Sequence, residues 1–328
     1  MNSSLRAVPA TPFTPDSLRR CLPPFGFHQH LPRDPLLQAY RSYYGLDFEQ
    51  QHAGLKVHLG QVSVGGFDIA VQSFCPRNAR GTVFVVHGYY DHVGVFNHVI
   101  RALLDSQFAV MTFDLPGHGM SSGARATIHN FHQYQPVLHK VIGLAEGHLP
   151  APWHFVGQST GSAIISEYLL QHSDLPRRLR FSSAVLFAPL VRPVNWWFNQ
   201  HLHTVVSRFR DYIPRKFAHS TNDRAFHRFQ LTADPLQPRY LSAQWLGALK
   251  QWIPFIERHD PLALPVLIVQ GQADETVDWR FNTRLLQDKF PRAELFTLPA
   301  MRHQIANEAQ AFRSQVFVRM IRFLRQHS

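Results

Sequence analysis

The sequence WHFVGQSTGSAIISEYLL (residues 153–170) is the segment that says most about the fold of this chain. Its first four residues are a short, mostly apolar run of the kind that is buried on both faces of a parallel sheet. From Ser162 to Gln171 the sequence favours a helix. Between the two lies GQSTG (157–161), a glycine-flanked turn with a serine at its centre. The prediction is a buried strand, a tight turn that presents Ser159, and a helix.

Similar short apolar runs recur along the chain, and helical segments separate most of them. The runs are Thr82–Val86, Phe108–Phe113, Ala184–Phe187, Val266–Val269 and Glu294–Leu298. The helical segments are His98–Ser106, His132–Glu146, Phe281–Lys289 and Glu308–Gln326. Strands that alternate with helices predict an α/β fold with a mostly parallel, doubly wound sheet. Upstream, Leu55–Val64 and Phe67–Phe74 flank Gly65-Gly66 and predict a hairpin.

The chain divides into three predicted parts. Residues 1–54 are Pro-rich and predict an irregular N-terminal arm with one short helix near residues 36–44. Residues 55–193 and 263–328 carry the strand–helix alternation and form the core. Residues 194–262 show no strand pattern and contain four tryptophans. Because a structureless loop of this length is uncommon inside a compact domain, we expect an inserted helical cap, or lid.

Ser159 is the predicted nucleophile. In a G-x-S-x-G turn between a strand and a helix, strain projects the serine hydroxyl above the sheet. Gly157 and Gly161 allow the neighbouring backbones to approach closely. The start of the following helix brings backbone N–H groups and a partial positive charge to the reacting carbonyl. The alternative is an ordinary tight turn with an exposed serine.

The base and the acid follow from chain order. A serine hydroxyl needs a base, the base needs an orienting carboxylate, and after such a turn the acid precedes the histidine. Beyond residue 269 only His303 and His327 remain. His327 is the penultimate residue, where chains fray, so His303 is the predicted base. The alternative for His303 is a histidine in a surface loop.

Asp274 is the predicted acid, because it comes soonest after the strand Val266–Val269. Asp278 is expected to cap the following helix, where an aspartate accepts bonds from unpaired N–H groups. Asp114 also ends a strand but precedes Ser159, and we interpret it as structural. The backbone amides of Tyr89, which follows His87-Gly88, and of Thr160 are the predicted oxyanion-hole donors.

Together these residues resemble the α/β-hydrolase superfamily over roughly residues 55–328. HGYYDH (87–92), DLPGHGMS (114–121), GQSTG and GQADETVD (271–278) are similar to the group of monoacylglycerol lipases, lysophospholipases and serine aminopeptidases. The resemblance implies ester hydrolysis on an acyl chain, a helical lid and no cofactor. Gln158 and Thr160 depart from it, because relatives often have His and Met there, and this difference is expected to alter the wall of the pocket.

The resulting hypothesis is a serine hydrolase of carboxylic esters, a lysophospholipase or monoacylglycerol-lipase-like enzyme that acts on a small acyl ester or lipid through an acyl-enzyme. One alternative is a proline-preferring serine aminopeptidase, which needs cap acids such as Glu257 and Asp260 to hold a free amine. The other is a non-catalytic binding protein of the same fold, which typically lacks a triad residue. The sequence does not specify the oligomeric state.

The net charge of +11 is spread along the chain, mostly as Arg, with no basic tail. This pattern favours an anionic membrane surface or substrate over nucleic acid. Between residues 194 and 262, nine basic residues stand against five acidic ones beside the tryptophans. We therefore expect peripheral contact with an anionic membrane; the alternative is a set of ordinary solvated arginines.

Histidine and cysteine usage bears on metals and on location. None of the 21 histidines combines with acidic residues into an HExxH-like pattern, so no metal site is predicted. Cys21 and Cys75 suggest neither a disulfide scaffold nor a metal site, which favours a reducing compartment. The N-terminus lacks the apolar core of a signal peptide. The expected location is the cytoplasm, extending to peripheral contact at the inner face of the membrane.

Overall fold

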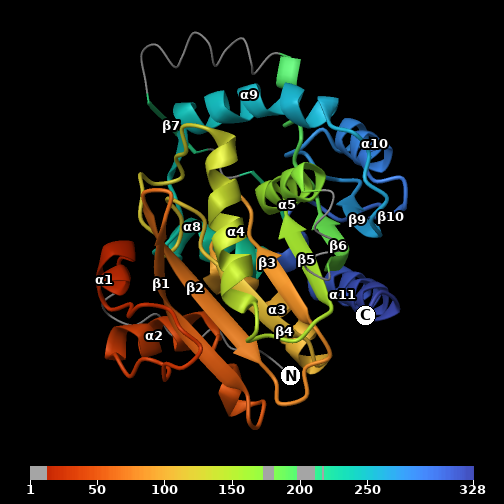
Figure 1. The fold of residues 1–328 in the computed structure, drawn as a ribbon. Coiled ribbons are helices and arrows are strands. Elements are labelled where there is room, and N and C mark those ends of the chain that lie inside the picture. The colour runs from red at the N-terminus through yellow and green to blue at the C-terminus, as the bar shows by residue number, and fades with distance from the viewer. Residues whose placement is uncertain (1–12, 173–180, 198–210, 216–217) are drawn as a thin grey trace.

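The computed structural model describes residues 13–172, 181–197, 211–215 and 218–328 (Figure 1). An eight-stranded sheet has the order β1-β2-β4-β3-β5-β6-β9-β10. Its strands are β1 (Lys56–Val64), β2 (Phe67–Cys75), β3 (Thr82–Val86), β4 (Ala109–Phe113), β5 (Trp153–Gln158), β6 (Phe181–Phe187), β9 (Val266–Gly271) and β10 (Ala293–Leu298). β1 and β2 form the predicted hairpin, β2 also pairs antiparallel with β4, and the remaining pairs are parallel. The prediction of a mostly parallel α/β sheet is confirmed.

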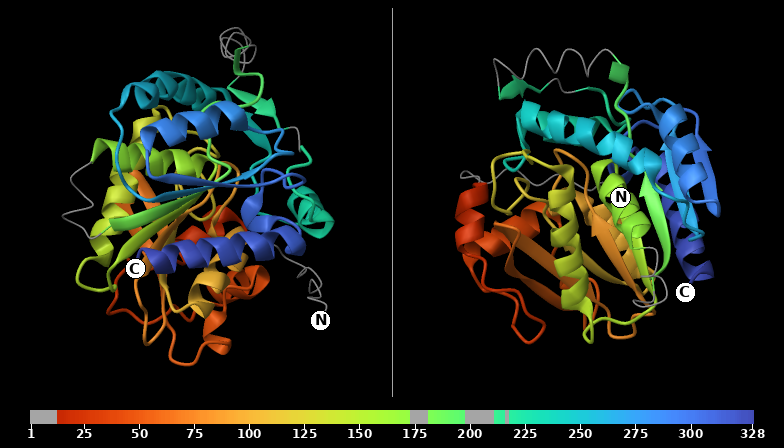
Figure 2. Two further views of the ribbon diagram at one scale, coloured as in Figure 1. Left: turned by 90° about the vertical axis from the view of Figure 1, so that its right-hand side faces the viewer. Right: turned by 45° about the horizontal axis from the view of Figure 1, so that its top comes forward.

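The central strands are buried on both faces, as their continuous apolar runs predict. In β3, Phe84 and Val86 pack into one hydrophobic cluster, whereas Val83 and Val85 pack into the other. The first cluster contains residues of α4 (Tyr134–Ala145), α5 (Thr160–Gln171) and α10 (Trp279–Lys289). The second contains residues of α3 (Asn97–Asp105) and α11 (Gln310–Gln326). Helices therefore cover both faces of the sheet (Figure 2).

The N-terminal arm differs from its prediction. In place of one short helix in an irregular chain, it forms α1 (Pro15–Arg20), α2 (Pro35–Tyr44) and the 3-10 turn η1 (Phe48–Gln50). Thr14 caps α1 with a reciprocal side-chain pair to Ser17, and Asp34 caps α2. Leu18, Leu37 and further arm side chains are buried in the α3/α11 cluster. α2 matches the helix predicted near residues 36–44, whereas local capping and burial stabilise α1, which the Pro-rich composition did not predict.

The segment between β6 and β9 contains strand as well as helix. β7 (Tyr212–Pro214) and β8 (Tyr240–Ser242) form a two-stranded antiparallel ribbon, which the sequence did not predict. α8 (Arg224–Thr232) and the long α9 (Ala243–Arg258) are helical. α9 runs across the top of the sheet, above the end to which β5 points (Figure 1). Strands of three residues are too short for an alternation pattern to show. No helix among the described residues is long and apolar enough to cross a membrane.

Candidate active site

Ser159 lies between β5 and α5, at the carboxyl end of the central strands. Its backbone has φ 53° and ψ −110°, a conformation that non-glycine residues seldom adopt. The turn is held because the Ser159 amide donates to the Phe187 carbonyl at 2.8 Å and the Ser159 carbonyl accepts from the Ala163 amide at 3.1 Å. A strained backbone conformation of this kind persists only where many surrounding interactions hold it in place.

The two glycines of the turn are required by contacts with neighbouring backbones. A Cβ on Gly161 would lie 2.1 Å from the Val86 carbonyl oxygen, and a Cβ on Gly157 would lie 2.7 Å from the Ser162 nitrogen. Both distances are far inside van der Waals contact. Any other residue at either position would therefore push α5 away from β3 and β5.

The structure brings the three predicted residues Ser159, Asp274 and His303 together. His303 Nδ1 lies 2.8 Å from Asp274 Oδ2, and His303 Nε2 lies 3.0 Å from Ser159 Oγ. A carboxylate only accepts, so the proton belongs on Nδ1 and the free Nε2 accepts from the serine hydroxyl. All three residues are more than nine-tenths buried. Residues from three loops thus form one hydrogen-bonded chain, in which Ser159 and His303 are 144 residues apart in sequence and Asp274 and His303 are 29 apart.

Asp274 accepts hydrogen bonds from several directions. Besides His303, its oxygens accept from the amides of Thr276 (2.8 Å) and Val277 (3.2 Å) and from Gln270 Nε2 (3.0 Å). Burial alone raises the pKa of Asp274, but the charge of His303 and these bonds outweigh burial, so the pKa is lowered. Asp274 is therefore a carboxylate at neutral pH. The sequence analysis did not identify Gln270. A polar residue at the end of an apolar strand was the feature that could have indicated a role at the site.

The imidazole of His303 carries the opposite shift. Burial alone lowers the pKa of His303, but the charge of Asp274 and its hydrogen bond outweigh burial, and Asp91 adds to them. The net pKa lies above its ordinary value. A carboxylate that stabilises the protonated imidazole suits a base that must accept a proton during a reaction.

Two side-chain amides hold the loop that carries His303. Gln158 Nε2 donates to the His303 carbonyl at 2.8 Å, and Gln158 Oε1 accepts from the Ala306 amide at 3.4 Å. Gln304 Nε2 donates to Asp91 Oδ1 at 2.9 Å. The sequence analysis interpreted Gln158 only as a change in the pocket wall. The structure makes it a tether between β5 and the loop of His303.

The other two candidate aspartates have structural partners. Asp278 is the N-cap of α10 and accepts from the Phe281 amide at 3.3 Å. Asp114 is fully buried and accepts from the amides of Val93 (2.8 Å) and Met120 (2.9 Å). Each of these carboxylates satisfies turn or helix amides, as the sequence analysis expected.

The loop after β3 lies beside Ser159. Within the described chain, the Tyr89 and Thr160 amides donate to no protein acceptor. The imidazole of the neighbouring His87 is uncharged, because burial and the nearby His118 hold its pKa well below the ordinary value. Its Nδ1 donates to the Gly88 carbonyl and its Nε2 accepts from the Leu115 amide, at 2.8 and 2.9 Å. His87 thus fixes the start of this loop.

Two tryptophans of the cap segment pack onto the core. Trp245 stacks on the ring of Tyr89 with centroids 3.9 Å apart. Trp252 donates from Nε1 to Glu167 on α5 at 2.8 Å. Both indoles are buried, so they hold α9 against the core. Of the other cap aromatics, Trp197 is exposed, and Phe198 lies outside the described residues.

The motifs and the fold are both shared with known proteins. A family model described as serine aminopeptidase, S33, matches residues 77–310. This chain belongs to that family. Monoacylglycerol lipase of Mycolicibacterium smegmatis is 25% identical over 269 residues, which cover 75% of this chain and 90% of that protein. Monoglyceride lipase of Mus musculus is 27% identical over 212 residues, covering 61% and 67%.

Solved structures agree with this family assignment. A soluble variant of monoglyceride lipase from Saccharomyces cerevisiae, in complex with a substrate analog, superposes with a TM-score of 0.70. It is 21% identical and covers 82% of this chain and 95% of its own. At this identity the match shows the fold alone. Sequence relatives and fold together place the chain in the α/β-hydrolase superfamily, in the monoacylglycerol lipase group.

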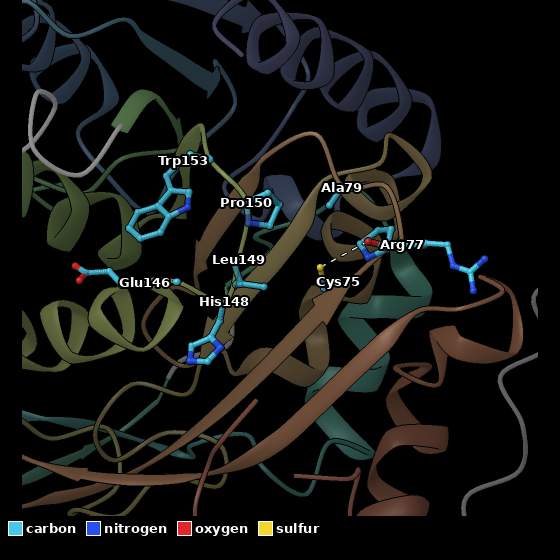
Figure 3. A pocket seen from close by; sticks show the side chains of 11 residues that line it. Cys75, Arg77, Ala79, Glu146, His148, Leu149, Pro150 and Trp153 are labelled. Carbon is cyan, nitrogen blue, oxygen red and sulfur yellow. Dashed lines mark hydrogen bonds between the residues drawn. The ribbon is translucent and has the colours of Figure 1, made fainter. Parts of the chain in front are cut away.

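A pocket of about 710 Å³ lies away from Ser159, beside the amino ends of β3 and β5. Leu149, Pro150, Trp153 and Arg77 are among the residues that line it (Figure 3). Open parallel sheets bind their ligands at the opposite, carboxyl edge. This pocket is therefore separate from the site of Ser159. No cluster of three or more His, Cys, Asp or Glu residues suited to a metal ion occurs among the described residues.

Proposed function

We propose that this chain is a serine hydrolase of carboxylic esters that carry one acyl chain, a monoacylglycerol-lipase-like enzyme or a lysophospholipase. The observation that carries the proposal is the buried chain of hydrogen bonds from Asp274 through His303 to Ser159, with distances of 2.8 and 3.0 Å. This arrangement supplies a nucleophile, a base and an orienting carboxylate in the required order.

The proposed reaction has two halves. Ser159 Oγ attacks the ester carbonyl carbon while its proton passes to His303 Nε2, and Asp274 stabilises the imidazolium. The tetrahedral oxyanion accepts from the amides of Tyr89 and Thr160. Collapse breaks the bond to the alcohol, which leaves with the proton from His303. Water then attacks the acyl-enzyme through the same base and releases the fatty acid.

The cap segment supports an ester over a peptide substrate. Glu257 is bound to Arg192, with Oε1 and Nη2 2.5 Å apart, so its charge is already compensated. Asp260 is exposed to solvent. An acid that recognises a free α-amine has to be free of other cations and screened from water, whereas Glu257 is paired with Arg192 and Asp260 faces solvent. The relatives named monoacylglycerol or monoglyceride lipase favour the same choice.

A substrate panel on the purified protein tests the proposal. We expect turnover of p-nitrophenyl esters of rising chain length and of monoacylglycerol or lysophospholipid, exceeding that of prolyl anilides by roughly tenfold or more. Faster hydrolysis of the anilides would favour the aminopeptidase. Protein that neither turns over any ester nor reacts with a fluorophosphonate probe would be a binding module.

We also propose that the enzyme takes its substrate at an anionic membrane surface. Tyr212 and Tyr240 lie on one face of the β7–β8 ribbon and are 43% and 56% exposed, and Trp197 is 74% exposed. Arg224 and Arg228 are exposed on α8. Aromatic rings at head-group depth beside arginines suit such a surface.

Sedimentation with vesicles measures this contact. Binding to vesicles rich in anionic lipid should exceed binding to neutral vesicles, and it should weaken with salt, because exposed charges are screened over about 8–10 Å at physiological ionic strength. Replacing Arg224 and Arg228 together by Gln should reduce binding and leave hydrolysis of a small soluble ester unchanged. A Val318→Ser variant on α11 is the matched control. Equal binding to both kinds of vesicle, or to neither, would remove the proposal.

A further inference from the structure

The N-terminal arm reaches the cap segment although it lies outside residues 77–310, the part that matches the family. The contact is made by the last two residues of α2. Tyr43 Oη donates to the Ala233 carbonyl at 2.6 Å, and Tyr44 Oη donates to Asp234 Oδ1 at 2.7 Å. The rings of both tyrosines also pack near Phe229 of α8, with centroids 5.9 and 6.1 Å away. The arm therefore holds the cap by bonds as well as by packing.

Asp234 is the point where three parts of the chain meet. Its carboxylate accepts from Tyr44 of the arm, from the Leu236 amide at 3.0 Å, and from His92 Nε2 at 3.0 and 3.2 Å. His92 belongs to the loop after β3. Tyr44, Asp234 and His92 are all at least 96% buried. A carboxylate so deeply buried is tolerated only when it is paired and hydrogen-bonded, so each donor matters.

The electrostatics of this junction couple His92 to Asp234. Burial alone lowers the pKa of His92, but the charge of Asp234 and its hydrogen bond raise it above the ordinary value. For Asp234, burial alone raises the pKa, but the charge and the bond of His92 and the bond of Tyr44 lower it. Each residue thus stabilises the charged form of the other against the effect of burial.

The loop from Gly88 to His92 is the one that carries the Tyr89 amide. Tyr44 also packs against it directly, with its ring 4.9 Å from the His92 imidazole. Gly94 makes room for that ring, because a Cβ there would lie 2.7 Å from Tyr44 Cγ. On its other side, the loop is bound through Asp91 to Gln304, next to His303. The adjacent residues Asp91 and His92 therefore bind this loop to the loop of His303 on one side and to the arm and cap on the other.

We propose that the N-terminal arm is a working part of the hydrolase and that Tyr44 is a positioning residue. Through Asp234, its hydroxyl holds His92 and thereby keeps the Tyr89 amide in place for the oxyanion. This inference rests on the proposed function. It assigns to residues outside the family match a role in turnover, in addition to their contribution to the core.

The test compares Tyr44→Phe with Tyr40→Phe. Both residues are buried on α2, but the Tyr40 hydroxyl accepts from Gln72 Nε2 on β2, away from the cap. Tyr44→Phe should lower kcat for a small soluble ester by roughly three- to tenfold with KM nearly unchanged, because misplacing a donor weakens binding of the transition state only. Tyr40→Phe should leave both constants unchanged. Melting temperatures of the two variants control for a loss of stability.

A double-mutant cycle tests the route through Asp234. If Tyr44 acts through this carboxylate, adding Tyr44→Phe to Asp234→Ala should cause no further loss of kcat. If the alanine variant does not fold, the comparison of Tyr44→Phe with Tyr40→Phe still decides the proposal. Equal losses of kcat in those two variants, or an unchanged kcat in Tyr44→Phe, would overturn it.

Hydrogen exchange separates this inference from the proposed function, because it needs no substrate. The amides of Asp91, Val93 and Val95 are protected by hydrogen bonds within and beside the loop. They should exchange faster in Tyr44→Phe than in wild type, and at the wild-type rate in Tyr40→Phe. Unchanged exchange in Tyr44→Phe would overturn the coupling. A wild type that hydrolyses no ester, with faster exchange in Tyr44→Phe, would overturn the proposed function and leave the coupling in place.

Discussion

Ser159→Ala is expected to lower kcat for every ester substrate by at least about a thousandfold, since removal of one triad member usually costs several orders of magnitude. The hydroxyl is the group that forms the acyl-enzyme, and no other side chain among the described residues is hydrogen-bonded to His303 Nε2. The residue is small and its backbone bonds remain, so the fold should be retained. Turnover of a p-nitrophenyl ester and the melting temperature are the measurements.

The matched control is Ser162→Ala, three residues further along the chain at the start of α5. The Ser162 hydroxyl donates to the Gly157 carbonyl at 2.8 Å and does not contact His303. A fluorophosphonate probe should label the wild type and Ser162→Ala, and should fail to label Ser159→Ala. An alanine variant at 159 that keeps more than about a hundredth of wild-type activity would show that the nucleophile lies elsewhere.

Asp274→Asn should lower kcat by about a thousandfold or more, whereas Asp278→Asn should change it by less than about threefold. An amide keeps the shape of Asp274 but no longer stabilises the imidazolium of His303, and it favours the wrong tautomer. Asp278 only caps α10. Steady-state kinetics of the two variants on one ester decide between them, and a larger loss at Asp278 would reverse the assignment of the acid.

The pH dependence of the Asp274 variant has a defined sign. In the wild type, kcat/KM should fall as pH drops through the raised pKa of His303, because the protonated imidazole accepts no proton. Removing the charge of Asp274 leaves burial as the main influence, and burial lowers the pKa. The acidic limb of the residual activity should therefore move to lower pH. A limb that stays in place would mean that Asp274 does not act on His303.

Sequence alone determined the architecture of the core, because that part of the fold follows from local chemistry. A strand buried on both faces must be apolar at nearly every position. A run such as Thr82–Val86 can therefore be recognised from its own residues, without knowledge of the strands that pair with it. The glycines around Ser159 are likewise local, since the turn itself forces close backbone contact. Chain order and position after a strand then singled out His303 and Asp274, which the fold brings within hydrogen-bond distance of one another.

The residues that hold the catalytic groups in position could be identified only from the tertiary structure. Gln158 and Gln270 are glutamines at the ends of strands, and nothing in their neighbourhood along the chain distinguishes a tether from a solvated side chain. Tyr44 and Asp234 are 190 residues apart in sequence. A single hydrogen bond between such residues leaves no periodicity, spacing or composition to read. Periodic burial involves residues that are close together in the sequence, so it leaves a pattern there. A contact between two distant residues leaves no such pattern and is seen only in the folded chain.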